Sequence, residues 1–467
     1  MADLFKLQEH GADVRKEVVG GITTFVTMAY IIVVNPAILQ AAGIPIGPST
    51  VATILAAVFG TMLMAFYANR PIALAPYMGE NAFLAYVAVA GMSITVGQRL
   101  GAVFVGGAVF LLITVLHIRG WLANSISSSL KHSFAVGIGL FLSFIGLYNT
   151  GIVKSFAVGK PLFVLVNKAP DAAPLPPLDK VPVSGVPVPV ELGHLGDPLV
   201  LLAISGFVLT VVLMVFQVRG AILLGIVGTA LVGYATGHGQ APKGILAMPF
   251  TGEYSLAPVA FQLDILGVLK LSFLPILLTL FLMDFLDTLG TLIGVGAAGN
   301  LLDEKGDFPK IERPMLVDAL ASMFGALVGT STTGAYIESA TGIRDGARTG
   351  LAALVTGLLF LASLFFIPLV APLQQLTYAY GPALIVVGIL LMQSVTKINF
   401  SDLTEAVPAF ATIVMMLFTY NIGNGLTVGL VLHPIIKLAA GRWSEVTAGS
   451  IVLGLLSLVY YVFGMPH

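Results

Sequence analysis

Cysteine is absent from the 467-residue chain, which excludes disulfide bonds and thiolate metal sites. Charged residues make up only 10% of the sequence, against about 25% in a typical soluble domain. The net charge is −1 and no run of basic residues occurs, so nothing in the sequence indicates nucleic-acid binding. These shortages exclude an ordinary soluble domain.

Long apolar stretches fill most of the chain. It is 57% hydrophobic with a mean hydropathy of +0.98, and its 52 Gly suit closely packed membrane helices. Because a spanning helix needs about 20 mainly apolar residues, we expect an all-α polytopic membrane protein with segments near 18–39, 50–68, 79–92, 100–118, 133–152, 198–217, 220–237, 267–298, 314–329, 334–345, 350–370, 380–395, 405–420 and 422–440. The segments 79–92 and 334–345 are too short to cross alone, and 447–464 is either a further span or a surface segment.

The Lys and Arg residues orient these segments, because cytoplasmic loops carry an excess of both. Lys6, Arg15 and Lys16 place the N-terminus in the cytoplasm, and the basic residues of later loops alternate in agreement with that placement. The Pro- and Val-rich segment 150–197 then falls outside. We expect it to form a short extended or β-type excursion rather than a domain.

Three stretches of the first half align, in order, with three of the second. TMAYIIVVNPAILQAAG (27–43) aligns with MDFLDTLGTLIGVGAAG (283–299), AAVFGTMLMAF (56–66) with ASMFGALVGTS (321–331), and RLGAVFVGGAVFLL (99–112) with RTGLAALVTGLLFL (348–361). The offset stays between about 249 and 265 residues. Two halves of seven segments each are predicted, and because seven is odd the second half enters the membrane from the opposite side. Such an inverted repeat is typical of transporters, with the substrate site near the midplane.

Two short segments interrupted by Gly or Pro occupy matching places in the halves, as expected for such a site. ALAPYMGENAFLAY (73–86) and GTSTTGAYIESATG (329–342) each predict an extended piece followed by a half helix whose N-terminus faces a cavity. Glu80 and Asn81 lie in the first, and Glu338 and Ser339 in the second. Alternatively, Asn81 and Ser339 only join helices by hydrogen bonds. Phe83 supplies either ring contact to a ligand or packing.

Two carboxylates, Asp284 and Asp287, lie one helical turn apart in an apolar span. A carboxylate at the centre of a span costs on the order of 2.5–3.5 kcal/mol, so such residues indicate function. Thr288 and Thr291 share the same helix face. Since two close carboxylates resist joint ionisation, we expect proton binding here. Asp318, in the next span, is either a hydrogen-bond partner or proton relay for the pair, or a helix cap or helix–helix contact. No Lys or Arg lies mid-span, which indicates a neutral ligand or one that arrives with a cation.

Four stretches resemble one known family. TFVTMAYIIVVNPAIL (24–39), APYMGENAFLAY (75–86), MDFLDTLGTLIGV (283–295) and GTSTTGAYIESATGIRDGARTG (329–350) are similar to the AzgA-like hypoxanthine/adenine/guanine permeases of the nucleobase–cation symporter-2 (nucleobase–ascorbate transporter) superfamily. The resemblance extends from about residue 4 to the C-terminus. Tyr77 and Glu80 depart from it, because smaller or apolar residues are expected at those positions.

The resemblance implies the 7+7 inverted repeat of the uracil-transporter type, with a core domain (1–120 and 241–371) and a gate domain (121–240 and 372–467). It also implies import of purine nucleobases by proton symport with an elevator-type mechanism. The protein would lie in the plasma (inner) membrane, as a homodimer, with the proton as coupling ion and no other cofactor.

By the same resemblance, Asn81, Asp284 and Glu338 match substrate ligands. Asp287 and Asp318 match residues of proton coupling and site support, and Thr27 faces the same cavity. Ser339 and Phe83 join the candidate substrate site by position, and Thr288 joins the candidate proton site. Glu80 either belongs to the proton site as well or faces the cytoplasm.

Three alternatives stay open. The same fold could carry xanthine, uracil or an anion, although an anion carrier would favour a basic residue near the half helices. An intramembrane aspartyl protease needs carboxylates from two facing helices, which neighbours on one helix do not supply. In an ion channel, Asp284 and Glu338 would be filter charges, and saturable, proton-dependent purine uptake would distinguish a carrier from it.

Overall fold

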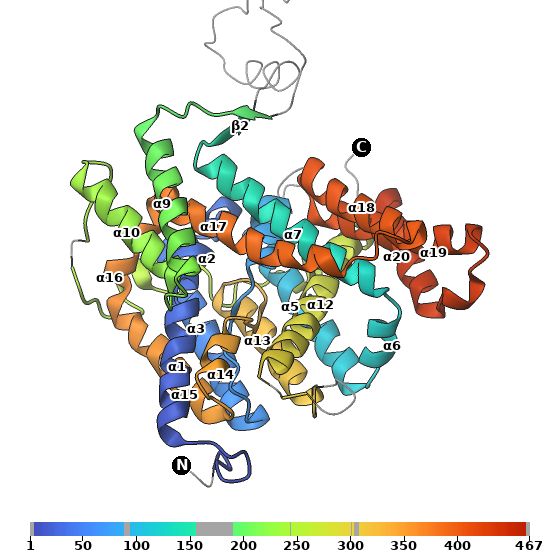
Figure 1. Cartoon of the computed structure of the whole chain (residues 1–467), viewed down its shortest axis with the longest axis horizontal. Coiled ribbons are helices and arrows are strands. Elements are labelled where there is room, and N and C mark those ends of the chain that lie inside the picture. The colour runs from blue at the N-terminus through green and yellow to red at the C-terminus, as the bar shows by residue number, and fades with distance from the viewer. Residues whose placement is uncertain are drawn as a thin grey trace, which may run out of the picture.

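The computed structural model describes residues 4–87, 94–155, 190–242, 244–299, 301–302 and 308–463. These residues are mainly helical, as the sequence predicts (Figure 1). Within the described ranges, nine helical stretches are long and apolar enough to cross a membrane. The protein is a multi-pass membrane protein.

The elements of the first half are α1 (Val14–Met28), α2 (Ile31–Leu39), α3 (Ile46–Leu63), β1 (Leu74–Pro76), α4 (Met78–Ala82), α5 (Val96–Val115), α6 (Arg119–Asn124), α7 (Ser128–Asn149), β2 (Val153–Ser155), β3 (Val190–Leu192), α9 (Pro198–Val215) and α10 (Ala221–Ala235). Those of the second half are α11 (Ile265–Val268), α12 (Leu274–Ala298), α13 (Glu312–Val328), β4 (Thr333–Ala335), α14 (Ser339–Arg344), α15 (Gly350–Ser363), α16 (Ile367–Val370), α17 (Thr377–Met392), α18 (Leu403–Phe418), α19 (Ile422–Ala439) and α20 (Ala448–Phe463).

The region expected to lie outside, 150–197, falls mostly beyond the described residues. At its two ends β2 and β3 pair antiparallel. The last apolar run forms α20, which packs on α19.

Helix packing in one half has a counterpart in the other. The contact of α3 with α15 has its counterpart in the contact of α13 with α5. The contact of α7 with α18 has its counterpart in the contact of α17 with α9. Likewise α9 packs on α10 and α18 on α19. In Figure 1, α9, α10, α17, α7, α18 and α19 run across the upper part of the molecule, and α1, α14 and α15 lie below them.

Strands β1 and β4 pair antiparallel in the interior, with Ala75 opposite Gly334 at the centre. Tyr77 and Tyr336 lie two residues beyond this central pair, and each donates its backbone N–H to a carbonyl of the opposite segment at 3.0 Å. The two segments are therefore related as if by a two-fold axis through the central pair. Both predicted extended pieces are confirmed as strands.

Hydroxyl groups from the preceding helices bind these strands in the same way. The N–H of Leu74 donates to Thr61 Oγ1 at 2.9 Å, and the N–H of Thr333 donates to Ser322 Oγ at 3.0 Å. Because β1 and β4 each have only one strand neighbour, these hydroxyls satisfy backbone groups that would otherwise be buried without a partner.

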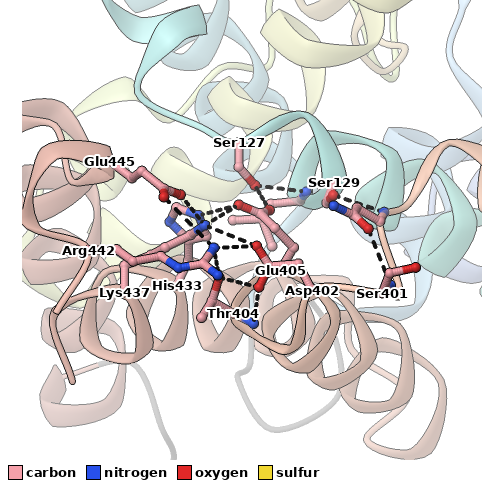
Figure 2. A network of polar contacts seen from close by, with 12 residues as sticks. Ser127, Ser129, Ser401, Asp402, Thr404, Glu405, His433, Lys437, Arg442 and Glu445 are labelled. Atoms are coloured by element: carbon pink, nitrogen blue, oxygen red, sulfur yellow. Dashed lines mark hydrogen bonds and ion pairs between the residues drawn. The ribbon is translucent and has the colours of Figure 1, made fainter. Parts of the chain in front are cut away.

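Apart from the strands, a cluster of charged and polar side chains joins α7, α18 and α19 (Figure 2). Lys437 Nζ lies 2.8 Å from Glu405 Oε1 and 2.5 Å from Glu445 Oε2, and its side chain is only 2% exposed. Ser127 donates to Glu405 Oε2 at 2.7 Å, and His433 Nε2 lies 3.4 Å from Glu405 Oε1. The buried ammonium is thus neutralised by carboxylates, as burial requires.

Candidate substrate site

The site is built where the two strands end and the half helices α4 and α14 begin. Tyr77 follows β1 and lies across Gly334, where any added Cβ would enter its ring. Only glycine therefore allows Tyr77 to cross the opposite strand. The ring of Tyr77 stacks on that of Tyr336, with centroids 6.2 Å apart and planes 9° from parallel.

Asp284 is buried on α12 and faces the strands. Ser322 donates to its Oδ2 at 3.0 Å, and the same hydroxyl accepts the N–H of Thr333 at 3.0 Å. The Thr333 carbonyl, 3.3 Å from the Ser322 hydroxyl, is a second acceptor for its single proton, so Ser322 links Asp284 to the strand. Asp284 Oδ1 has no hydrogen-bond partner among the described residues.

Asp318, on α13, is bound to the second strand. The N–H of Ala335 donates to its Oδ2 at 2.9 Å, and the hydroxyl of Tyr77 lies 3.5 Å from the same oxygen. That hydroxyl is also 3.1 Å from Thr288 Oγ1. Tyr77 thereby links β1 to α12 and α13. The other carboxylate oxygen of Asp318 has no partner in the described chain.

Glu338 and Thr27 lie at the contact between α14 and the first helices. The hydroxyl of Tyr30 donates to Glu338 Oε1 at 2.7 Å. Thr27 Oγ1 lies 3.1 Å from Thr341 Oγ1 and also bonds backbone carbonyls of its own helix. Thr27 therefore joins α1 to α14.

Asn81 belongs to a chain of buried amides and hydroxyls. Its Nδ2 donates to Asn35 Oδ1 at 2.6 Å, and Asn35 in turn donates to Thr53 at 2.7 Å and to Thr330 at 2.9 Å. Within the described ranges the Oδ1 atom of Asn81 has no partner.

Glu80 is fully buried, and neither of its carboxylate oxygens has a hydrogen-bond partner in the described residues. Ser339 accepts the N–H of Ala73 at 3.0 Å, so its role in this conformation includes support of β1. Phe83 is buried in the turn after α4, and its ring edge faces Gly423 of α19. Asp287 is half-buried on α12.

The arrangement thus presents several buried acceptor atoms for which the described part of the chain offers no donor: both oxygens of Glu80 and one oxygen each of Asn81, Asp284 and Asp318. Burying such atoms without partners costs free energy, so they point to a ligand that donates hydrogen bonds or to bound protons. Within the described residues no group of three His, Cys, Asp or Glu side chains could hold a metal ion.

Four residues that sequence reasoning missed support the site: Tyr30, Asn35, Tyr77 and Ser322. Asn35 precedes Pro36 in an apolar span, and this polar interruption was the available signal. Tyr30 and Ser322 gave none, because Tyr and Ser are ordinary in membrane helices. In the sequence, Tyr77 stands out only as a departure from the family pattern.

Comparison with known proteins identifies a transporter rather than an enzyme. The family profile described as "Permease family" matches residues 15–172 and 183–427, and the chain belongs to this family. MJ0326 of Methanocaldococcus jannaschii, which carries the general name of permease, is 42% identical over 98% of this chain and 97% of its own. The guanine/hypoxanthine permease PbuO of Bacillus subtilis is 38% identical (98% and 99%), and the adenine permease AdeP of Escherichia coli is 37% identical (99% and 96%).

Two solved transporters share the fold at low sequence identity. The transmembrane domain of the cyanobacterial bicarbonate transporter BicA superposes with a TM-score of 0.55 at 15% identity, over 89% of this chain and 97% of that one. The murine anion transporter Slc26a9, in its inward-facing state, gives 0.58 at 12% identity, over 91% and 68%. The overall structure of SLC26A9 gives 0.57 at 11% identity, and this chain covers 66% of it.

Proposed function

We propose that the protein imports purine nucleobases by proton symport across the plasma (inner) membrane, with its N-terminus in the cytoplasm. The relatives named as adenine and guanine/hypoxanthine permeases match nearly the full length of both chains, which supports a purine substrate. The proton is the coupling ion, and no other cofactor is needed.

The unsatisfied acceptors of the site carry this proposal. A purine is a flat ring with N–H donors and nitrogen or oxygen acceptors at its edge, so it can satisfy carboxylate and amide oxygens. In our assignment Asp284, Asn81 and Glu338 bind the base, with Ser339, Phe83 and Thr27 shaping its cavity. A base that lacks one donor would leave a buried oxygen unpaired, which gives selectivity.

Protons bind the remaining carboxylates. In our assignment Glu80 and Asp287 take up the proton. Asp318 and Thr288, which the Tyr77 hydroxyl connects, support the site. Neutralising this region removes charge from the low-dielectric interior and permits the base to bind beside it. An inside-negative potential contributes about 2.3 kcal/mol per charge per 100 mV to uptake.

The paired helix packing and the two-fold relation of β1 and β4 support a 7+7 inverted repeat. The core domain then comprises 1–120 and 241–371, and the gate domain 121–240 and 372–467. Transport is of the elevator type, in which the core moves against the gate and carries the site across. We also propose a homodimer.

Uptake by the Asp284→Asn variant tests this function. Cells that lack their own purine permeases, supplied with this protein, should accumulate radiolabelled adenine, guanine or hypoxanthine more strongly at acidic external pH. Asp284→Asn should abolish accumulation at unchanged expression, because Asn replaces one carboxylate oxygen with an NH2 donor and cannot accept both from Ser322 and from the base. Asp264→Asn is the matched control, since Asp264 is exposed and only caps α11, which Asn also does. Purine uptake at the original level by Asp284→Asn would contradict the assignment.

A further inference from the structure

A pocket of about 450 Å³ lies at the N-terminal end of the molecule, away from the strands. Three segments form it: the N-terminal turn around Lys6, residues 66–70 after α3, and the turn that leads into α13. Asn69 ties the wall formed by 66–70 to the N-terminal turn and to α15, because its Nδ2 donates to the Phe5 carbonyl at 3.0 Å and its Oδ1 accepts the N–H of Gly350 at 2.8 Å. The side chain of Phe5 is itself buried. The pocket is therefore a braced feature of the fold.

Its charge is strongly positive. Lys6, Arg70, Lys310 and Arg313 line it, and Glu9, the one acidic residue among the described lining residues, pairs with Lys6 at 3.0 Å. Arg70, Lys310 and Arg313 form no ion pair with any carboxylate in the described ranges. Among the described residues, three cations thus converge on one cavity without a carboxylate partner.

Aromatic rings and a carbonyl hold the guanidinium groups in place. Arg70 lies over the ring of Phe308 at 5.0 Å and donates to the Pro309 carbonyl at 2.7 Å, and Arg313 lies 5.8 Å from the ring centre of Tyr67. Arg313 is in the first turn of α13, where the helix dipole disfavours a cation. Helix stability therefore does not account for this arginine, whereas an anion in the pocket would.

The pocket also has an apolar rim. Leu4 and Phe66 line it with exposed fractions of 64% and 55%. Arg binds phosphate through a planar pair of N–H donors, and basic pockets between membrane helices bind phospholipid headgroups. We propose that this pocket binds a phosphate-bearing anion, with the headgroup of an anionic phospholipid or free inorganic phosphate as its source. The site is independent of the substrate site and of the nature of the transported solute.

Thermal unfolding of the full chain in lipid nanodiscs tests the proposal. One arm compares discs of phosphatidylcholine with discs that also contain phosphatidylglycerol. A second arm adds inorganic phosphate to phosphatidylcholine discs, against sodium chloride of equal ionic strength. We expect a higher midpoint in one arm or both, and a Lys310→Gln/Arg313→Gln variant should bind roughly tenfold more weakly and lose the shift. Lys270→Gln, an exposed lysine outside the pocket, is the control and should keep it.

Each outcome of the two arms either supports or overturns the proposed anion site. A shift with phosphatidylglycerol alone identifies a lipid headgroup, and a shift with phosphate identifies a free anion site; both support the proposal when the double variant loses the effect. No shift in either arm, or the same shift in the wild type and the double variant, would overturn it. Circular dichroism of the double variant without anion shows whether its helices are intact.

Discussion

The rings of Tyr77 and Tyr336 stack 6.2 Å apart at the crossing of β1 and β4, and each tyrosine donates its backbone N–H to the opposite segment. The two residues are equivalent in position, yet their hydroxyls differ. That of Tyr77 faces Thr288 and Asp318, whereas that of Tyr336 donates to the Pro76 carbonyl. The symmetric backbone thus carries an asymmetric site.

This asymmetry predicts different effects of two matched substitutions. Tyr77→Phe keeps the ring contacts and removes the hydroxyl beside the carboxylates, so purine uptake should fall roughly tenfold, the equivalent of about 1.4 kcal/mol. Tyr336→Phe removes a structural bond and should cost about 1 kcal/mol of stability with little change in the uptake rate. Initial uptake rates and thermal midpoints, measured on both variants, check this. Equal effects on uptake would contradict the asymmetry.

Lys437 should be essential to the cluster of Figure 2. Lys437→Met removes the buried cation that contacts both Glu405 and Glu445 and leaves Arg442, 3.8 Å from Glu445, as the remaining cation beside them, so the variant should lose about 3 kcal/mol of stability. The double variant Lys437→Met/Glu405→Gln should regain part of the loss, because the Glu405 charge that lost its partner is gone. A thermal-unfolding double-mutant cycle measures the coupling. Additive effects of the two changes would show that the ion pair does not contribute.

Acid should weaken the link between Asp402 and its neighbours. Hydrogen bonds from the Thr404 hydroxyl and backbone N–H, together with Arg442, lower the pKa of Asp402 to about 2. Since this value lies below the ordinary value near 4, the contribution to stability is present above pH 4 and is lost as the pH falls towards 2.

The test compares the wild type with Asp402→Asn, which can still cap α18. The wild type should have the higher thermal midpoint at pH 7, and the difference should shrink between pH 5 and pH 3. A difference that stays constant over this range would show that the carboxylate charge is not the cause.

The ion pair of Arg219 with Asp345 should favour the conformation described here. It joins the α9–α10 turn of the proposed gate to the end of α14 in the proposed core, at 2.7 Å, and Asp345 also accepts the hydroxyl of Thr23 at 2.6 Å. Arg219 is largely exposed, so the pair contributes up to about 1 kcal/mol, which changes a two-state population ratio up to about fivefold.

Because the chain contains no cysteine, introduced cysteines can be labelled selectively, and the population of this conformation can be measured. Spin labels on Leu231→Cys in α10 and Leu358→Cys in α15, both exposed positions, report the distance between the two parts by pulsed electron resonance. Arg219→Gln should lower the population of the present distance, whereas Lys154→Gln, an exposed pair elsewhere, should not. Unchanged distributions in Arg219→Gln would contradict the role of the pair.

The sequence predicted the helical membrane class and both broken segments, because Pro76, Gly79 and Gly334 interrupt apolar runs and carry strong local preferences. It could not predict which residues of the strands face one another, since Ala75 and Gly334 are brought together only by the whole fold. The alignment of 56–66 with 321–331 gives an offset of 265, whereas the equivalent hydroxyls of Thr61 and Ser322 lie 261 apart, one helical turn away. An apolar helix has a similar residue pattern after one further turn, so a sequence alignment of two such helices can be displaced by one turn.

In the candidate site too, the sequence predicts conspicuous residues but not the residues that the fold brings next to them. Asp284 and Asp318 were predictable because a carboxylate in a span is costly and therefore conspicuous. Their hydrogen-bond partners were not, because Ser322 and Tyr30 are unremarkable in an apolar helix and Tyr30 is 308 residues from Glu338.

Thermal stabilisation of the purified protein by nucleobases tests the central claim most directly. Hypoxanthine, guanine, adenine, xanthine and uracil would each be added at several pH values to the wild type, Asp284→Asn and Asp264→Asn. A ligand at 100 times its dissociation constant adds about 2.7 kcal/mol, a readable shift. We predict a shift with one or more purines that Asp264→Asn keeps and Asp284→Asn loses. No shift with any nucleobase, or an equal shift in Asp284→Asn, would contradict the account.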